Sequence, residues 1–262
     1  MNKAMLAIIK KDLRSITANK LLITTILSVP LALTVIIPTA FVLIIHFMPE
    51  QSGDFQKLLA LIPQVEQSED LGLTLVKAVL NYIMPVFFLI IPIMTASVMA
   101  ASSFVGEKEK HTLETLLYSP LSLDQIFRAK ILASFSLSML VSLISFCAML
   151  LALEIEVFFT ANSLVAPNFS WLIVLLLLSP AIALIAITII VRGSAKAQTV
   201  EEAQQGAVFL LLPILLLLVG QFTGLLLVSA WLLLGLAVAA ALLALVLLKN
   251  AMHRFSYEKL LR

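Results

Sequence analysis

A series of long apolar runs with almost no charges constrains this chain more than any other feature. Roughly 20 apolar residues are needed to span the hydrocarbon core of a bilayer, and a backbone in lipid must satisfy its own hydrogen bonds. Each run therefore predicts a transmembrane helix, and the predicted fold class is an all-α integral membrane protein with six transmembrane helices. The predicted spans cover about 21–48, 79–105, 126–152, 171–191, 207–228 and 230–248.

The composition supports the membrane assignment. Hydrophobic residues make up 61% of the 262 residues and charged residues only 12%, and the mean hydropathy is +1.11. Soluble domains carry about twice this share of charge, because they need a polar surface. The predicted domains are a segment 1–20, a membrane domain 21–248 with a loop at 106–125, and a tail 249–262. The weak break near Ser229 leaves open whether the last two runs are full spans or half-entering helices.

The basic residues predict the orientation. One side of the map carries fifteen of the 17 Lys and Arg residues, and the other side carries only Lys57 and Lys77 beside seven acidic residues. Basic loops stay in the cytoplasm. We therefore expect a multi-pass protein of the plasma membrane with both termini in the cytoplasm. The basic side comprises residues 1–20, 106–130, 192–196 and 249–262.

The span interiors lack charged residues, which argues against a proton-driven pump and indicates that energy arrives from outside the bilayer. Prolines lie inside the runs and predict bent helices. Small residues form stripes that allow either close helix packing or a polar path. The prolines are Pro30, Pro38, Pro85, Pro92, Pro180 and Pro213, and the small residues are Ser134, Ser138 and Ser142 with a Gly220–Gly224 pair.

The first residues predict an amphipathic helix over 2–17. Met5, Ile9 and Leu13 share one face at helical spacing, and Lys10 and Arg14 share the other. This pattern is typical of a helix in the headgroup layer, so the lipid bilayer is its expected partner. A basic anchor that only sets the topology is the alternative.

The loop 106–125 predicts a short helix below the membrane. A capping threonine, a glutamate in the first turn and three leucines on one face define the helix, and a Ser-Pro pair ends it. Ser122 and Gln125 then form a capping box that begins span three. Such an element can transmit force from a soluble partner. The alternative is a helix that packs only on its own protein. The residues expected to couple are Glu107, Lys108, Thr112, Leu113, Glu114, Leu116, Leu117, Ser119 and Pro120.

Motifs for catalysis are missing from the sequence. The chain has no GxxxxGK[ST] phosphate loop. His46, His111 and His253 have no metal-ligand spacing, and Glu201-Glu202 lacks the histidine of an intramembrane protease. We therefore expect no catalytic, cofactor or metal residues, and the chain is not predicted to be an enzyme.

The segment Gly106-Glu107-Lys108-Glu109-Lys110, followed by Thr112-Leu113-Glu114 and Leu117–Ser122, resembles the GEKE-x-GTLE-x-LL-x-SPLS signature of ABC-2 type permeases, except that His111 replaces a frequent glycine. Glu202–Gln205 before Pro213 and the basic approach to span one are also similar to that family. The resemblance implies a type V-like exporter fold with a membrane-surface helix and a coupling helix. It also implies two copies of a cytoplasmic ABC ATPase that bind ATP and Mg, and a second permease chain as homo- or heterodimer, with no role for nucleic acid.

The function expected from this resemblance is the permease subunit of an ATP-driven exporter. The charge-free spans favour a hydrophobic or amphipathic substrate, such as a drug, an antibiotic peptide or a lipid. Asn81 and Tyr82 would lie at an external mouth beside the loop 49–78. The alternatives are a non-transporting scaffold or sensor that anchors an ATPase, and export of sodium ion.

Overall fold

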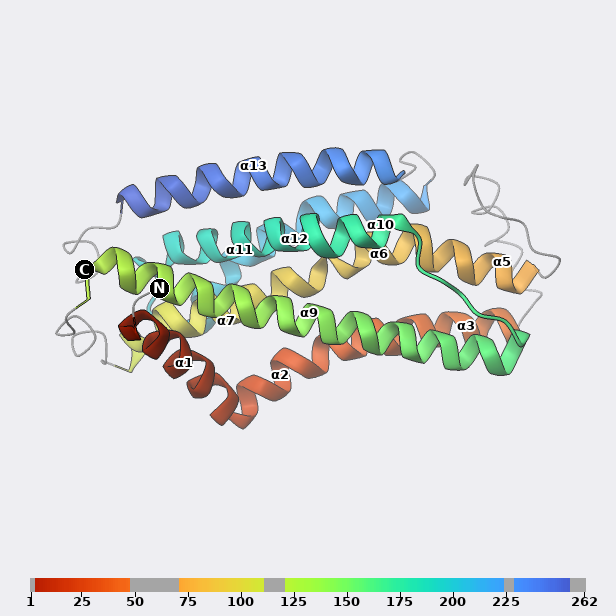
Figure 1. Ribbon diagram of the computed structural model, residues 1–262, viewed down its shortest axis with the longest axis horizontal. Coiled ribbons are helices and arrows are strands. Elements are labelled where there is room, and N and C mark those ends of the chain that lie inside the picture. Colours follow the sequence, from red (N-terminus) through yellow and green to blue (C-terminus); the bar gives the residue numbers. More distant parts are fainter. Residues whose placement is uncertain (1–2, 48–70, 111–120, 224–228, 255–262) are drawn as a thin grey trace.

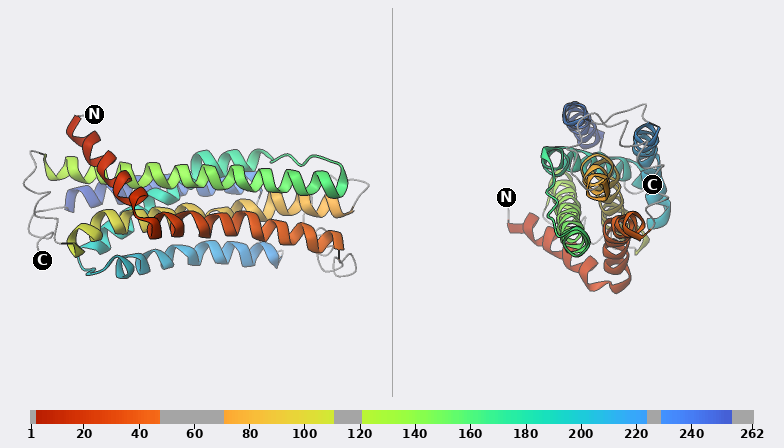
Figure 2. Two further views of the ribbon diagram at one scale, coloured as in Figure 1. Left: turned by 90° about the horizontal axis from the view of Figure 1, so that it is seen from below. Right: turned by 90° about the vertical axis from the view of Figure 1, so that its right-hand side faces the viewer.

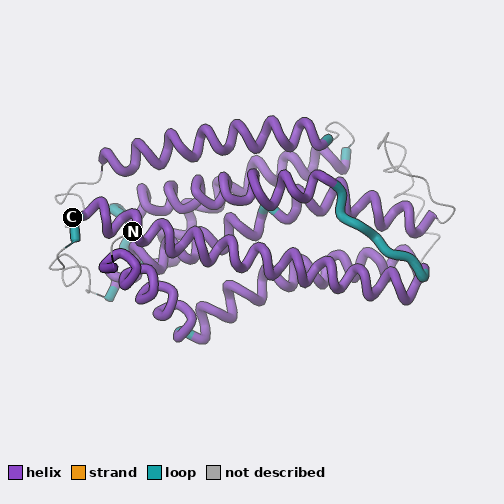
Figure 3. The backbone as a smooth tube through the Cα atoms, in the orientation of Figure 1, coloured by secondary structure: helices purple, strands orange, loops and turns teal. Residues whose placement is uncertain are grey.

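The computed structural model describes residues 3–47, 71–110, 121–223 and 229–254, and these form helices joined by short connections, with no strand among them (Figures 1 and 3). Six of the helices are long and apolar enough to cross a membrane, which confirms the all-α membrane fold. They run side by side along the long axis of the molecule (Figure 1). The first helix, α1 (Lys3–Ala18), lies obliquely at one end of this bundle (Figure 2).

The spans follow one another along the chain. Several consist of helical segments that continue one another. Span one is α2 (Lys20–Leu31), η1 (Ala32–Ile36) and α3 (Ile37–Phe47); span two is α5 (Leu71–Ala78), η3 (Val79–Ile83), α6 (Met84–Phe88) and α7 (Ile90–Glu109); span three is α9 (Leu123–Ala161); span four is α10 (Phe169–Ile173), η4 (Val174–Leu178) and α11 (Ser179–Ser194); span five is α12 (Val200–Phe222); span six is α13 (Ala230–Arg254).

Spans two and three are longer than the apolar runs from which they were predicted. The 39 residues of α9 extend for about 58 Å at a rise of about 1.5 Å per residue, whereas the hydrocarbon core is about 30 Å thick. Both ends of these helices therefore project beyond the hydrocarbon. Charged residues occur only near the two ends of α9, from Asp124 to Lys130 at one end and at Glu154 and Glu156 at the other.

The two ends of the bundle differ in charge. We call the end with Lys108, Arg128, Arg192 and Lys249 the basic end, and the end with Glu154 and Glu156 the acidic end. The helix α1 and the last described turn of α13 both lie at the basic end (Figure 1).

The second and fourth spans form the centre of the bundle. In their most apolar windows 72% and 61% of the residues are buried, against 39% or fewer in the other four spans. The helix α7 packs against α9, α11 and α12, and α11 also packs against α13. The outer helices turn large apolar side chains away from the protein, among them Leu151, Phe159, Phe209 and Trp231. These faces suit lipid, which solvates apolar side chains.

The prolines explain why three spans are interrupted. Each of the π-helical segments η1, η3 and η4 ends two residues before a proline, at Pro38, Pro85 and Pro180. A proline has no N–H to donate, and the turn just before each of these prolines instead contains wider bonds that run to a carbonyl five residues earlier. The N–H groups of Met84 and Ser179 make bonds of this wider kind to Val79 and Val174. The spans consequently continue through their prolines as widened helices.

The beginning of α9 agrees with the sequence in detail. The Ser122 hydroxyl accepts from the Gln125 N–H at 3.3 Å, and the Gln125 side chain accepts from the Ser122 N–H at 3.2 Å. This reciprocal pair satisfies two N–H groups that a helix start leaves without partners. The predicted capping box is confirmed, and it fixes the residue at which span three begins.

Candidate functional site

Buried charges gather at the basic end of the bundle around Lys130. This residue lies two turns inside α9, and only 3% of it is exposed. Its Nζ is 2.9 Å from Oε2 of Glu107 and also donates to the backbone carbonyl of Ser103, both on α7. The ammonium lies 5.4 Å from the centre of the Phe104 ring. An ion pair between Lys130 and Glu107 thus joins the start of span three to the end of span two.

The helix α1 adds a carboxylate and a second ammonium to this site. Oδ2 of Asp12 accepts from the Ser103 hydroxyl at 2.6 Å and lies 3.9 Å from Nζ of Lys130. Lys11 donates to Oε1 of Glu107 at 2.5 Å. We call Lys11, Asp12, Glu107 and Lys130 the ionic cluster. Its two carboxylates balance its two ammonium groups, as buried charges require.

The sequence interpretation of these residues needs correction. The sequence analysis counts Lys130 only among the basic residues that set the orientation, but the structure buries it inside a helix. Glu107 and Lys108 are predicted to lie in the coupling loop, but they belong to the last turn of α7, and Glu107 is buried. The charges of the GEKE signature that are described here therefore make contacts within the chain.

The next two residues of the signature bind the connection between spans four and five. Nζ of Lys108 lies 3.4 Å from the carbonyl oxygens of Ala195 and Ala197. A carboxylate oxygen of Glu109 accepts from the Val200 N–H at 3.2 Å, at the start of α12. Carbonyls at the end of one helix attract a cation, and N–H groups at the start of the next attract an anion. The end of α7 is therefore joined to α1, α9, α11 and α12.

The helix α1 packs on the bundle instead of lying free of it. Along its buried side Ile8, Asp12 and Ile16 follow one another at intervals of four residues. The predicted apolar residues Met5, Ile9 and Leu13 are partly buried beside this stripe. Lys10 and Arg14 are exposed, so the predicted basic face turns away from the protein. Sequence reasoning missed Asp12, although a carboxylate between two isoleucines on one helical face was a visible signal.

The serine stripe of α9 is buried where α9 packs against α7. Ser134, Ser138 and Ser142 are each 2% exposed or less. The Ser138 hydroxyl is 2.9 Å from the Thr95 hydroxyl and donates to the Pro92 carbonyl at 3.2 Å. These small side chains allow the two helices to approach closely. In span five Gly220 is buried, whereas Gly224 lies outside the described residues.

Asn81 and Tyr82, the predicted mouth residues, lie in the π turn of span two toward the acidic end. Oδ1 of Asn81 accepts from the Asn168 N–H at 2.8 Å. The Tyr82 carbonyl accepts from the Gln221 side chain at 2.8 Å, and the Leu80 carbonyl accepts from the Trp171 indole at 3.0 Å. Side chains of spans four and five thus satisfy the carbonyls of the π turn, and the turn joins three spans.

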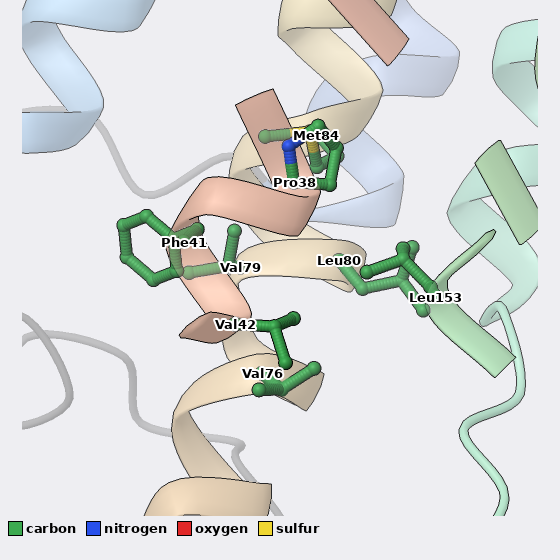
Figure 4. A pocket seen from close by; sticks show the side chains of 8 residues that line it. All are labelled: Pro38, Phe41, Val42, Val76, Val79, Leu80, Met84 and Leu153. Carbon is green, nitrogen blue, oxygen red and sulfur yellow. The ribbon is translucent and has the colours of Figure 1, made fainter. Parts of the chain in front are cut away.

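A small apolar pocket of about 10 Å³ lies nearby, between spans one, two and three (Figure 4). Its lining has no charged side chain. The described residues also hold no group of three His, Cys, Asp or Glu side chains that could bind a metal ion. The pocket is lined by Pro38, Phe41, Val42, Val76, Val79, Leu80, Met84 and Leu153.

The other residues predicted to couple, from Thr112 to Pro120, lie outside the described residues. The two helices that lead into and out of their segment, α7 and α9, are the ones that Glu107 and Lys130 join.

A comparison with protein families identifies the chain. The family model described as ABC-2 family transporter protein matches residues 50–232, which is more than half of the chain. The chain belongs to this family of ABC-2 transporter proteins. It is therefore a membrane subunit of a transporter, as the signature beginning at Gly106 indicated. Comparisons with curated proteins and with solved structures give no match. The matched residues of this ABC-2 protein include Glu107 and Lys130 but neither α1 nor span one.

Proposed function

We propose that the chain is the permease subunit of an ATP-driven exporter. In this proposal a separate cytoplasmic ABC ATPase, in two copies, hydrolyses ATP with Mg, and a second permease chain completes the membrane pore. The basic end faces the cytoplasm, and the substrate is hydrophobic or amphipathic. The observation that carries the proposal is the match to the ABC-2 family over residues 50–232.

The ionic cluster supports a coupling role for the segment between α7 and α9. Glu107 and Lys130 are joined at 2.9 Å just before and just after this segment. A force applied to the segment would therefore displace spans two and three together. The contacts of Lys108 and Glu109 with residues 195–200 would pass the same displacement to spans four and five.

The segment itself is proposed to dock on the ATPase through its leucines. A helix in a groove binds through apolar side chains at spacings of three and four residues, and Leu113, Leu116 and Leu117 have this spacing. A carboxylate buried in such a groove costs several kcal/mol, because it must lose its water and take up a proton. We therefore expect Leu117→Asp to prevent docking, and Glu114→Lys to weaken it by reversing a charge.

The test is purification of the tagged chain together with its ATPase, followed by measurement of ATP hydrolysis and of transport in vesicles. Leu117→Asp should insert normally yet lose the ATPase and the transport. Leu164→Asp is the matched control, because Leu164 is 73% exposed near the acidic end. Full ATPase binding and full transport by Leu117→Asp would refute the docking proposal. ATPase binding with no compound that stimulates hydrolysis would favour a scaffold or sensor, and stimulation by sodium alone would favour sodium export.

A further inference from the structure

We propose that α1 is a releasable helix, held on the bundle by Asp12, which detaches from α7 and α9 during the transport cycle. The proposal concerns regulation of the permease and rests on the proposed function. Its evidence lies in the ionic cluster, where the contacts of α1 are arranged differently from those between α7 and α9.

The first observation is that few side chains of α1 are fully buried, and that one of them is charged. Of its 16 residues only Ile8, Asp12 and Ile16 are buried. Ile8 packs with Ile126 and Ala129 of α9, and Ile16 joins a second small group with residues of spans one, two and three. Met5, Ile9 and Leu13 pack beside these isoleucines but stay partly exposed, so the apolar contact of α1 is shallow and Asp12 is the one charged side chain that the helix buries. The attachment of α1 therefore depends strongly on Asp12.

The second observation is that Lys130 does not need Asp12. Nζ of Lys130 is 2.9 Å from Glu107 and also binds the Ser103 carbonyl, but it is 3.9 Å from Oδ2 of Asp12. The stronger bond of Asp12 is the one that it accepts from the Ser103 hydroxyl at 2.6 Å. If α1 moves away, Lys130 and Glu107 remain paired.

Release therefore leaves no isolated charge in the protein. Asp12 carries its own charge into water or the headgroup layer, where it is solvated. Lys11, half exposed in its pair with Glu107, returns to solvent at small cost. Breaking a buried ion pair is normally expensive because one charge stays behind without a partner. Release of α1 leaves no buried charge without a partner. Separation of α7 from α9, by contrast, would leave Lys130 and Glu107 without each other.

The third observation is the position of the attachment. Ser103 and Glu107, the two partners of α1 on α7, lie in the last two turns before the segment 111–120. A small displacement of this end of α7 would move the hydroxyl that holds Asp12. Docking and release of the ATPase would in this way control whether α1 lies on the bundle or in the headgroup layer, which its exposed Lys10 and Arg14 suit.

The experiment measures how accessible the buried side of α1 is. Ile8→Cys in a Cys147→Ser background is labelled with N-ethylmaleimide in vesicles of phosphatidylcholine and phosphatidylglycerol. Leu6→Cys is the control, because Leu6 is 52% exposed on the same helix. Adding Asp12→Ala should raise the labelling rate of the Ile8→Cys variant by roughly tenfold or more, the factor expected for loss of a charge-assisted hydrogen bond. The labelling rate of the Leu6→Cys variant should not change, and Asp12→Asn, which keeps the acceptor, should fall between.

The cycle is tested on the purified complex with the ATPase. Trapping with ATP, Mg and vanadate should change the labelling of the Ile8→Cys variant severalfold, with Asp12 intact. A double variant, Ile8→Cys with Ile126→Cys, allows α1 to be joined to α9 by a short bifunctional thiol reagent. This cross-link should stop ATP-driven turnover, while each single variant treated in the same way stays active.

Two results would overturn the proposal. Equal labelling of the Ile8→Cys variant with and without Asp12→Ala would overturn the role of Asp12. Undiminished turnover of the cross-linked complex would overturn release. The vesicle measurement needs no ATPase, so a failure to find the ATPase would count against the proposed function alone.

Discussion

Replacing Lys130 by methionine is the most informative perturbation of the basic end. Methionine nearly matches the length of the lysine stem and removes only the charge. The variant leaves Glu107 and Asp12 with side chains 11% and 6% exposed and without their shared cation. Removing one partner of a buried ion pair costs about 3–5 kcal/mol, because the remaining charge stays buried and unpaired. Lys11 still reaches Glu107, so we expect the lower part of this range.

The assay is thermal unfolding of the purified chain in one detergent. A loss of about 3 kcal/mol lowers the midpoint by roughly 6–12 °C, taking about 2–4 °C per kcal/mol for a chain of this size. Arg128→Met is the matched control on the same helix. Arg128 pairs with Asp124 at 2.9 Å, but both side chains are about half exposed. Exposed pairs four residues apart contribute only about 0.3–0.5 kcal/mol, so its midpoint should hardly move.

A triple variant shows whether unpaired charge is the cause. Asp12→Asn and Glu107→Gln added to Lys130→Met remove all three buried charges while nearly keeping the shapes. Neutral replacement of a buried ionic group is often close to neutral for stability. The triple variant should therefore unfold at a midpoint temperature close to that of the unchanged chain. The effects of the three changes on stability will then not be additive. If Lys130→Met unfolds no earlier than Arg128→Met, or if the triple variant is less stable still, this account of the cluster is wrong.

Three other predictions concern orientation, the start of α9 and the π turn. In a Cys147→Ser background, Leu164→Cys should react in intact cells with a thiol reagent that cannot cross membranes, and Lys196→Cys should not; the opposite pattern would invert the proposed orientation. Ser122→Ala should destabilise the chain by about 1 kcal/mol, the usual contribution of a helix cap, and Ser122→Thr should keep most of it; equal midpoints for the two variants would contradict the cap. Trp171→Phe should cost about 1–3 kcal/mol because it leaves the Leu80 carbonyl buried without the indole donor; an unchanged midpoint would show that another donor replaces it.

The membrane fold could be predicted from the sequence because lipid imposes a strong local rule. An apolar run of about 20 residues must become a helix in lipid whatever its neighbours do. The capping box at Ser122 and Gln125 was predictable for a similar reason, since both partners lie within one turn. The serine stripe of α9 also follows from helical periodicity alone, although its partner helix does not.

The π turns needed the structure, even though the prolines were visible. A proline inside a span can bend the helix, break it or be absorbed by a wider turn, and local sequence does not decide among these. In span two the outcome depends on distant donors, because Trp171 and Gln221 satisfy the carbonyls of Leu80 and Tyr82. The bond of Asn81 with Asn168 likewise joins two segments that are far apart in the sequence, so the sequence could not predict it.

The sequence by itself determined that this chain crosses a membrane, where most of its helices lie and to which family it is similar, because all three depend on composition and motifs read along the chain. Only the tertiary structure decided what the charges do. Asp12, Glu107 and Lys130 are separated by 95 and 23 positions along the chain, and nothing in their local sequences pairs them. They meet because α1, α7 and α9 pack together at the basic end, where burial excludes water and makes each charge depend on its partners.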